Sequence, residues 1–406
     1  MMNLERYRTP EDVGQLRTLA LGIGGIALIV WAVGAYFNTE QALRSWLLGF
    51  IFWGGIGLGS LGVLMLQYLT GGAWGVVIRR FVEAGSRTLP VIFLFFIPLA
   101  VGVYTHSLYE WTHLPPTDHA IAARGIYLLP WFWILRSLIY FALWGVMVYL
   151  LNKWGAQQDV TNSVEDSRLV LERASRFSGP MLVIYSLVVT FAAVDWVMTL
   201  DPHWFSTIWG LLFVAGWALS CFCFVVAILA YLAHTPTVSS VLGKRHFHDL
   251  GKLMLALVMV WAYFNFSQFL IIWSGNLPEE TGWFLIRMRG GWGYVGVALI
   301  VFHFAFPFLV LLQQDFKRRA KWLALLAIFI LIMRLVDMFY LIGPSHRVAA
   351  AGIEQGAFYI SWLDFVAPIA IGGIWLWWFF GELIKRPLFP ARDPYFAGAI
   401  EHGHGH

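Results

Sequence analysis

The sequence is poor in charged residues and in cysteine. Only 12% of its 406 residues are Asp, Glu, Lys or Arg, whereas soluble domains carry about 25%. This shortage excludes an ordinary soluble domain. The two cysteines, Cys221 and Cys223, are separated by a single residue within an apolar run, so they point to different faces of a helix. A disulfide between them is not expected, and two sulfurs alone cannot hold an iron–sulfur cluster.

Several functional motifs are also missing. The sequence contains no phosphate-binding loop, metalloprotease helix or nucleophile elbow. Its net charge of +4 is no sign of nucleic-acid binding, because lysine and arginine in such an apolar chain report membrane topology first. No cleavable signal peptide is expected, since the first apolar run follows a polar segment and is long enough to span a bilayer.

The chain is instead rich in apolar residues, which make up 59% of it. They form ten runs of about 20 residues, which is the length of a transmembrane helix. We therefore predict an all-α integral membrane protein with about ten transmembrane helices, in which residues 1–406 form one polytopic membrane domain. The expected helices cover about residues 16–37, 46–69, 90–110, 128–151, 180–200, 207–233, 252–273, 291–313, 321–342 and 361–383.

Lysine and arginine are distributed unevenly between the segments that join these runs. When the N-terminus is placed in the cytoplasm, most of them fall in cytoplasmic segments. The outer segments hold only Arg44, Arg124, Arg287, Arg289 and Arg347. The positive-inside rule therefore places both termini in the cytoplasm, and we expect a multi-pass protein of a bacterial plasma membrane. The longest cytoplasmic segment, about residues 152–179, is expected to form a short surface helix.

The second apolar run is rich in glycine. Gly55 and Gly59 have the small-xxx-small spacing that lets helix backbones approach closely. This helix is therefore expected either at the centre of the bundle or in contact with another subunit.

Ionisable residues inside the apolar runs are the candidate functional residues, because such residues are rare in membranes and usually face a protein interior or a wet cavity. Asp195 is the first of them, and its alternative interpretation is a structural aspartate that is hydrogen-bonded near a helix end. With a rise of about 1.5 Å per residue, most of these residues lie in the outer third of the membrane. The candidates for a proton path are His106, Arg136, Asp195, His303, Arg334 and Asp337, with Tyr263, Gln268 and Asp364 as secondary polar candidates.

Two ion pairs are plausible among these candidates. Arg334 and Asp337 are three residues apart on one helix face, and Arg136 could pair with Asp195 across helices. His303 lies near mid-depth and could extend a water-filled path inward, although an interhelical hydrogen bond is the simpler explanation. The depths of His106 and His303 differ by roughly 10 Å, which argues against a bis-histidine haem. No metal site is predicted.

The outer loops are short and have an unusual content of proline, glycine and tryptophan. Proline and glycine make such loops tight, and tryptophan anchors them at the membrane interface. An ordered outer face of this kind indicates partner docking, although interfacial anchoring alone would explain part of the pattern. The candidate docking residues are Asp201, His203, Trp204, Asn276, Glu279 and Glu280.

Three segments carry a family resemblance. They are DWVMTLDPHWFST at 195–207, HDLGKL at 248–253 and YFNFSQFLIIWSGNLPEE at 263–280. Together they resemble the membrane subunits of bacterial alternative complex III, a quinol:electron-acceptor oxidoreductase of respiratory and photosynthetic electron-transport chains. Its two large membrane subunits are similar to the polysulfide-reductase (NrfD-like) anchors, and this chain looks more like the second of the two. The resemblance covers nearly the whole chain.

The resemblance implies two four-helix bundles plus two extra helices, with the bundles here at about 46–200 and 207–342. It also implies a set of partners: a homologous NrfD-like quinol-binding membrane subunit, an outer-face iron–sulfur protein, c-type cytochrome subunits and membrane lipids. Quinol oxidation would take place in the homologous subunit. This chain would be non-catalytic, supporting assembly and contributing a proton path. It would bind no cofactor itself, since quinol, iron–sulfur clusters and c-type haems are expected in partner subunits.

Two other functions remain open. In one, this chain binds quinol itself in an outer pocket with His106 and Asp195 as proton acceptors. In the other, it is a secondary transporter, which would require broken spans and charges at the membrane midplane. A purely structural anchor is a further explanation for every polar residue named.

Overall fold

The computed structural model describes residues 7–345 and 356–405, so Arg347 lies outside the described residues. Within them the chain forms helices and turns and no β-strand. Ten helical segments are long and apolar enough to cross a membrane, which confirms the all-α class and the predicted number of spans. The spanning segments contain α1 (Glu11–Phe37), α2 (Thr39–Thr70), α4 (Leu89–Tyr104) with the helix before it from Ala73, α6 (Pro130–Val160), α7 (Val164–Trp196) with the turn after it to Leu200, α8 (Trp209–Leu232), α10 (Lys244–Gly275), α15 (Ala320–Ile342), α16 (Leu363–Ile384) and a composite span of α12 (Gly290–Ala298), the π-helical η5 (Leu299–Ala305) and α13 (Phe306–Leu312).

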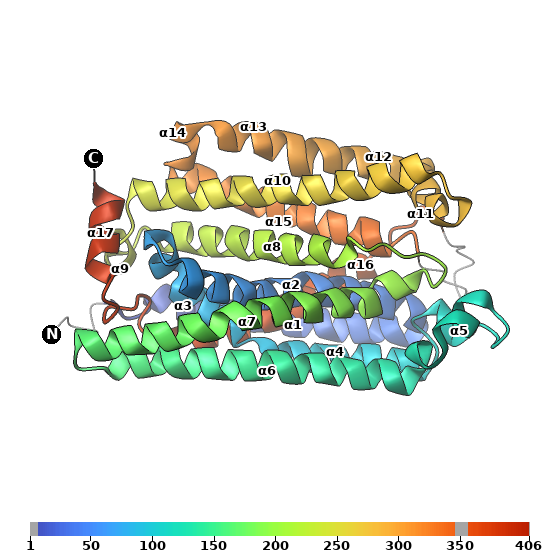
Figure 1. The fold of residues 1–406 in the computed structure, drawn as a ribbon, viewed down its shortest axis with the longest axis horizontal. Helices are drawn as coiled ribbons and strands as arrows, with labels where there is room; N and C mark the ends of the chain where they lie inside the picture. The colour runs from blue at the N-terminus through green and yellow to red at the C-terminus, as the bar shows by residue number, and fades with distance from the viewer. Residues whose placement is uncertain (1–6, 346–355, 406) are drawn as a thin grey trace.

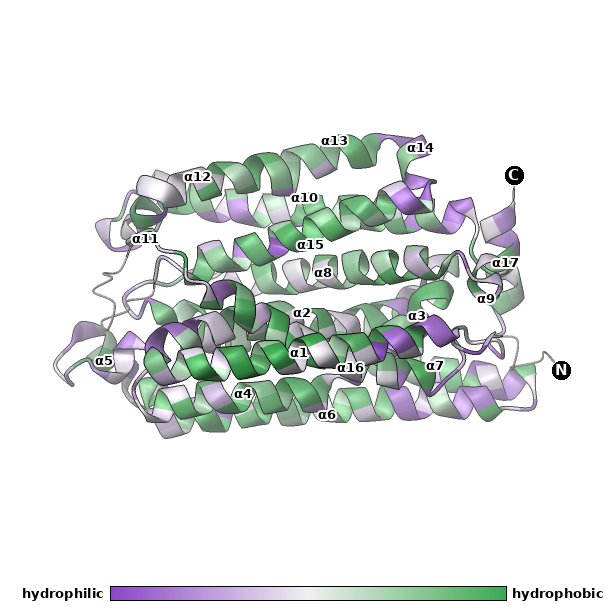
Figure 2. Ribbon diagram, turned by 180° about the vertical axis from the view of Figure 1, so that it is seen from behind, coloured by the Kyte–Doolittle hydropathy of each residue, from purple (hydrophilic) through white to green (hydrophobic). Residues whose placement is uncertain are grey.

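Shorter helices lie at the two ends of this bundle (Figure 1). They are α3 (Ala73–Ser86), which leads into α4, then η2 (Glu110–Thr112), α5 (His119–Arg124), η3 (Gly125–Leu128), η4 (Met198–Leu200), α9 (Pro236–Ser239), α11 (Pro278–Met288), α14 (Gln314–Lys317) and α17 (Phe396–His404). Figure 2 shows hydrophobic residues along the middle of the long helices and hydrophilic residues mainly at their ends. This distribution is typical of a multi-pass membrane protein.

Both termini lie at the same end of the molecule (Figure 1), as predicted for a chain with an even number of spans. The Tyr7 ring packs edge-on against Phe396 at 5.5 Å between centroids, and the backbone N–H of Leu388 donates to the Tyr7 carbonyl at 2.8 Å. We call this the terminal end and the other the opposite end.

The long helices form two groups around α2. The first contains α2, α4, α6 and α7; the second contains α8, α10, the α12–α13 span and α15; α1 and α16 pack on each other, and α16 also packs on α2. Of the ten spans, α2 is the most completely buried. This burial agrees with the first of the two predicted positions, the centre of the bundle.

Glycine lets α2 approach α8 at close range. A Cβ atom added at Gly59 would lie 2.2 Å from the carbonyl oxygen of Trp217, and one added at Gly55 would lie 2.3 Å from the Trp217 ring. Both distances are far below a van der Waals contact, so no larger residue fits without moving the helices apart.

Two boundaries differ from the prediction. The polar segment 152–179 forms no separate surface helix, because α6 continues to Val160 and α7 already begins at Val164. The Ser163 hydroxyl accepts a hydrogen bond from the backbone N–H of Asp166 at 3.0 Å, and this N-cap starts α7 well outside the apolar run. The third span ends at Tyr104 rather than near residue 110.

The contact between α2 and α8 leads to a stability prediction. Gly59→Ala is expected to destabilise the protein by about 1–3 kcal/mol, the usual cost of overpacking, and to lower the midpoint of thermal unfolding in detergent. Gly145→Ala is the matched control, because a Cβ at Gly145 on α6 would meet nothing within 4 Å. Equal midpoints for the two variants would show that the close approach is not required.

Candidate functional site

The first candidate cluster is an ion pair between α6 and the last turn of α7. Asp195 is fully buried, and Arg136 is 8% exposed. Arg136 Nε donates to Asp195 Oδ2 at 2.8 Å and Nη2 donates to Oδ1 at 2.9 Å. The Tyr140 hydroxyl adds a third hydrogen bond to Oδ2 at 2.8 Å. The carboxylate is therefore held by a two-point guanidinium contact and one phenol.

Aromatic residues enclose this pair. Trp133 Nε1 donates to the Asp195 carbonyl oxygen at 2.8 Å, and the Arg136 guanidinium lies 3.7 Å from the centre of the Tyr127 ring. Tyr127 belongs to η3, outside the spans, and burial followed by the charge of Asp195 raises the pKa of its hydroxyl. A pair this closely bonded is a poor proton carrier, because protonating Asp195 would leave Arg136 buried without a counter-charge.

The second candidate cluster lies in the other bundle, where α8, α10, η5 and α15 meet. Arg334 and Asp337 form the predicted ion pair on α15, and Trp261 Nε1 on α10 donates to Asp337 Oδ2 at 3.1 Å. Gly216 on α8 makes room for the guanidinium, since a Cβ there would lie 2.3 Å from Arg334 Nη2.

His303 adds an unusual group to this cluster. Its ring is fully buried and lies 3.9 Å from the Trp261 ring, between centroids. Neither ring nitrogen has a hydrogen-bond partner within the described residues. The ring is carried by the π-helical segment η5, a rare geometry that often occurs at functional sites. Buried polar groups are normally bonded to protein or ordered water, so the two unbonded ring nitrogens are an exception among the buried groups.

The six proton-path candidates do not form one continuous chain. Arg136 and Asp195 lie in the first bundle, whereas His303, Arg334 and Asp337 lie in the second. Among residues 7–345 and 356–405, no hydrogen bond or ion pair joins the two clusters. His106 joins neither, because it lies exposed in the turn after α4, with φ of 58°.

The secondary candidates have separate positions. Gln268 is buried and accepts a hydrogen bond from the Ser206 hydroxyl at 2.9 Å, which ties α10 to the connection between the bundles. Asp364, near the start of α16, accepts from Ser45 at 2.6 Å and from Gln41 at 2.9 Å. Tyr263 is 65% exposed on α10. Gln268 therefore binds the connection between the bundles, Asp364 links α16 to α2, and Tyr263 lies on the exposed surface of α10.

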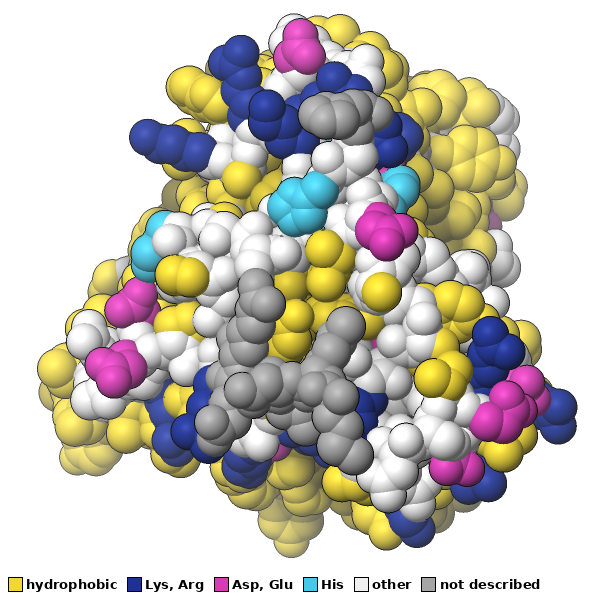
Figure 3. All heavy atoms as spheres, turned by 90° about the vertical axis from the view of Figure 1, so that its left-hand side faces the viewer, with side chains coloured by type: hydrophobic (Ala, Val, Ile, Leu, Met, Phe, Trp, Pro, Cys, Tyr) yellow, Lys and Arg dark blue, Asp and Glu magenta, His cyan; other side chains and the backbone are white. Residues whose placement is uncertain are grey.

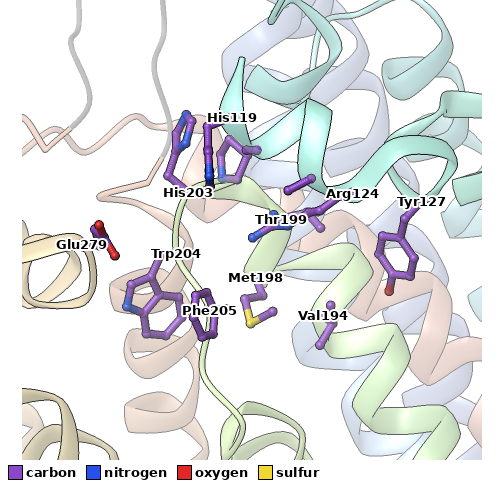
Figure 4. Close-up of a pocket in the computed structure, with 13 residues that line it drawn as sticks. His119, Arg124, Tyr127, Val194, Met198, Thr199, His203, Trp204, Phe205 and Glu279 are labelled. Atoms are coloured by element: carbon purple, nitrogen blue, oxygen red, sulfur yellow. The ribbon is translucent and has the colours of Figure 1, made fainter. Parts of the chain in front are cut away.

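A pocket of about 610 Å³ opens at the opposite end, between α5, η3, α11 and the connection from α7 to α8 (Figure 4). Its walls include apolar side chains such as Val194, Met198 and Phe205. The polar residues that line it are His119, Arg124, Tyr127, Thr199, His203 and Glu279. Because Tyr127 also stacks on Arg136, the pocket shares one wall with the first ion pair.

Two of the predicted docking residues make contacts within the chain. Trp204 is 4% exposed, stacks on Trp283 at 4.5 Å between ring centroids and donates from Nε1 to the Glu280 carbonyl at 3.2 Å. Asp201 accepts a hydrogen bond from the Ser345 hydroxyl at 2.7 Å. The connection thus folds back onto α11 and buries Trp204, whereas Asp201 is half-buried. His203, Asn276 and Glu279 are exposed, and Glu280 is half-buried.

Arg287 was interpreted from the sequence as an outer loop charge, yet it is fully buried. It donates to the Leu341 carbonyl at 2.9 Å and to Ser345 Oγ at 2.6 Å, and its guanidinium lies 3.5 Å from the Trp283 ring. The pKa of Arg287 is lowered to about 9, because the effect of burial exceeds the opposing effect of the Asp201 charge. The spacing of Trp283 and Arg287, one helical turn apart, is the sequence signal that could have found this contact.

A charge network at the terminal end was also missed. Arg80 Nη1 on α3 bonds to Glu83 at 2.7 Å, Arg386 Nη1 to Glu83 at 3.3 Å, and Arg79 Nη1 to Asp393 at 2.5 Å. All of these charges except Arg386 are buried. Arg79 and, through Glu83, Arg386 fasten α3 to the C-terminal segment, whereas Arg80 also pairs with Asp159 on α6.

The bidentate pair leads to a prediction. Asp195→Asn is expected to destabilise the protein by about 3–5 kcal/mol, because it leaves a buried guanidinium unneutralised. The double variant Arg136→Gln/Asp195→Asn should recover a large part of this loss in thermal unfolding. Glu172→Gln is the control, since its pair with Arg176 is largely exposed, and should have no measurable effect. A double variant as unstable as Asp195→Asn would contradict the explanation.

The described residues contain no group of three or more His, Cys, Asp or Glu side chains that could hold a metal ion. In comparisons with known proteins, no protein-family model and no curated protein matches this chain. What the protein does is therefore inferred from its residues and their geometry.

Proposed function

We propose that the chain is an integral membrane subunit of a quinol:electron-acceptor oxidoreductase of the alternative complex III type. The proposal is supported by the resemblance of its motifs at 195–207, 248–253 and 263–280 and by its ten-helix fold with two bundles. The observation that carries it is that each bundle encloses one neutralised ion pair, Arg136–Asp195 and Arg334–Asp337. Pairs fixed in this way suit a rigid supporting subunit in which quinol oxidation belongs to a homologous partner.

The orientation follows from the same proposal. Lysine and arginine side chains are numerous at the terminal end (Figure 3), so this end would face the cytoplasm of a bacterial plasma membrane. The opposite end would then meet an iron–sulfur protein and c-type cytochromes. Exposed His203, Asn276 and Glu279 would contact them, while buried Trp204 keeps the connection between the bundles in place.

A transporter is less well supported. Such proteins bind solutes at broken helices near the midplane, whereas α2, the glycine-rich span, is one uninterrupted helix from Thr39 to Thr70. The π-helical η5 is irregular, but its His303 ring packs against an aromatic side chain, Trp261.

The experiment that tests the proposal is purification of the chain with its native partners in mild detergent, followed by visible spectra and quinone extraction. We expect iron–sulfur and c-haem proteins to copurify, and the chain isolated from them to contain neither haem nor quinone. A chain that purifies alone and transports a solute would overturn the family assignment. An isolated chain that retains quinone would favour a second function, quinol binding by this chain.

The second function has one specific observation in its favour, the amphipathic pocket beside Tyr127 (Figure 4). Pockets of about 300–1,000 Å³ with apolar walls and a few polar groups are typical of small-molecule sites. In the same purification, Ala123→Trp would fill the pocket, because Ala123 lines it. The neighbouring Ala122→Trp is the control, since Ala122 is exposed on the same helix and is not part of the lining. Loss of quinone in the first variant alone would place the site here.

A proton path in the supporting subunit proposed first would use His303 rather than Asp195 or Asp337, because both carboxylates are held in ion pairs. His303→Phe keeps the aromatic contact with Trp261 and removes two buried nitrogens that lack partners, so assembly and thermal stability should be retained. Proton release per electron, measured in vesicles, is expected to fall. The control is Tyr263→Phe, which changes an exposed residue on α10 and should leave the proton release per electron unchanged. Unaltered proton release in the His303 variant would remove this residue from the mechanism.

A further inference from the structure

A group of cations surrounds the short helix α14 at the terminal end. We call it the α14 basic cluster; its members are Lys252 on α10, Lys317 and Arg318 at the end of α14, and Arg319 and Lys321 at the start of α15. Figure 3 shows Lys and Arg side chains gathered at the top of this end, where α14 lies in Figure 1. His248 on α10 is within electrostatic reach of Lys252, Lys317 and Arg318, so these side chains converge.

Nearby acidic residues do not neutralise the cluster. Asp249 on α10 contacts Lys252 at 3.4 Å, but its other oxygen accepts from His402 at 2.8 Å. Asp315, on α14 itself, forms no ion pair with the cluster. In the part of the chain that the structure describes, no carboxylate pairs with the four remaining cations, which are Lys317, Arg318, Arg319 and Lys321.

Lys317 is the unusual member, because it is only 5% exposed. Its stem lies in a groove that Gly251 provides on α10, where an added Cβ would come within 2.8 Å of Lys317 Cγ. Burial, followed by the charge of Lys252, lowers the pKa of the Lys317 ammonium. The positive-inside rule explains the presence of these cations, but it does not explain why the apolar stem of Lys317 is packed against α10 while its ammonium has no carboxylate partner in the described chain.

The depth of the cluster in the membrane indicates which anions can reach it. It lies where α13 ends and α15 begins, beside Trp322, which is 50% exposed. Exposed tryptophan at a helix end is typical of the headgroup level. Leu309 and Leu312 on α13 and Leu325 on α15 are also exposed and would face acyl chains. A cation at this position meets lipid phosphates before any other anion.

We propose that Lys317 and Lys252 bind the phosphate group of an anionic phospholipid in the leaflet at the terminal end, with Arg318, Arg319 and Lys321 strengthening its attraction and the acyl chains lying along α13 and α15. The site is independent of the function proposed above. Its ligand is defined by a phosphodiester anion joined to an apolar tail, which matches an unpartnered ammonium beside exposed leucines.

The test is titration of the delipidated full chain with phosphatidylglycerol, followed by native mass spectrometry. Lys252→Met/Lys317→Met removes two charges while methionine keeps the apolar stem against Gly251. Each cation at an anionic lipid surface strengthens binding about fivefold, so the double variant should bind about 25-fold more weakly. The matched control is Arg168→Met/Arg173→Met, which removes two exposed cations from the first part of α7, at the terminal end of the molecule.

The outcomes decide the proposal. Weaker binding in the first double variant alone, with Lys252→Arg/Lys317→Arg retaining affinity, supports the site. Equal binding in both double variants would mean that lipid is attracted by the whole basic face, and would overturn it. Inorganic phosphate that displaces the lipid at similar concentrations would show a site for the free anion instead. Phosphatidylcholine binding as tightly as phosphatidylglycerol would also overturn it.

Discussion

The contact between α2 and α8 is the packing constraint on which both clusters depend. Gly55 and Gly59 allow Trp217 to lie directly against α2, and the residue before it, Gly216, receives the Arg334 guanidinium from α15. One turn of α8 therefore touches the central helix on one side and the second ion pair on the other. Because α7 joins α8 through a short connection, the same contact also fixes where Asp195 lies relative to the second bundle.

Burying a charge in apolar surroundings is costly unless another group neutralises it, and the two bundles meet this requirement differently. The first encloses Asp195 with two contacts from Arg136 and one from Tyr140, which leaves little freedom for proton exchange. The second places an ion pair beside His303, whose nitrogens lack partners in the described chain. The bundles share an architecture, but in the described residues the ion pair of the second bundle lies near an imidazole with two unbonded ring nitrogens, whereas the Asp195 carboxylate of the first already accepts three hydrogen bonds.

The sequence predicts those features that depend on neighbouring residues. Apolar run length gives the ten spans, and the spacing of Arg334 and Asp337 gives their ion pair. It cannot fix features that depend on how distant segments meet. Arg287 looks like a loop charge until α11 folds against α15, and the segment 152–179 carries no hydropathy signal although its N-cap at Ser163 starts a helix. Pairing of Arg136 with Asp195 required helix rotations that apolar runs do not specify.

The two ends of the molecule balance their charge by different means. At the opposite end Arg287 is satisfied by carbonyl oxygens, a hydroxyl and an indole face within the chain. At the terminal end Arg79 and Arg80 find carboxylates on other elements, so their charges hold the fold together. The α14 basic cluster differs from both, because the nearby chain supplies only Asp249, which is shared with His402. Because Arg79 and Arg80 at the same end are paired with carboxylates of the chain, the unpaired cations of the α14 basic cluster at the headgroup level are placed to take their anion from the membrane.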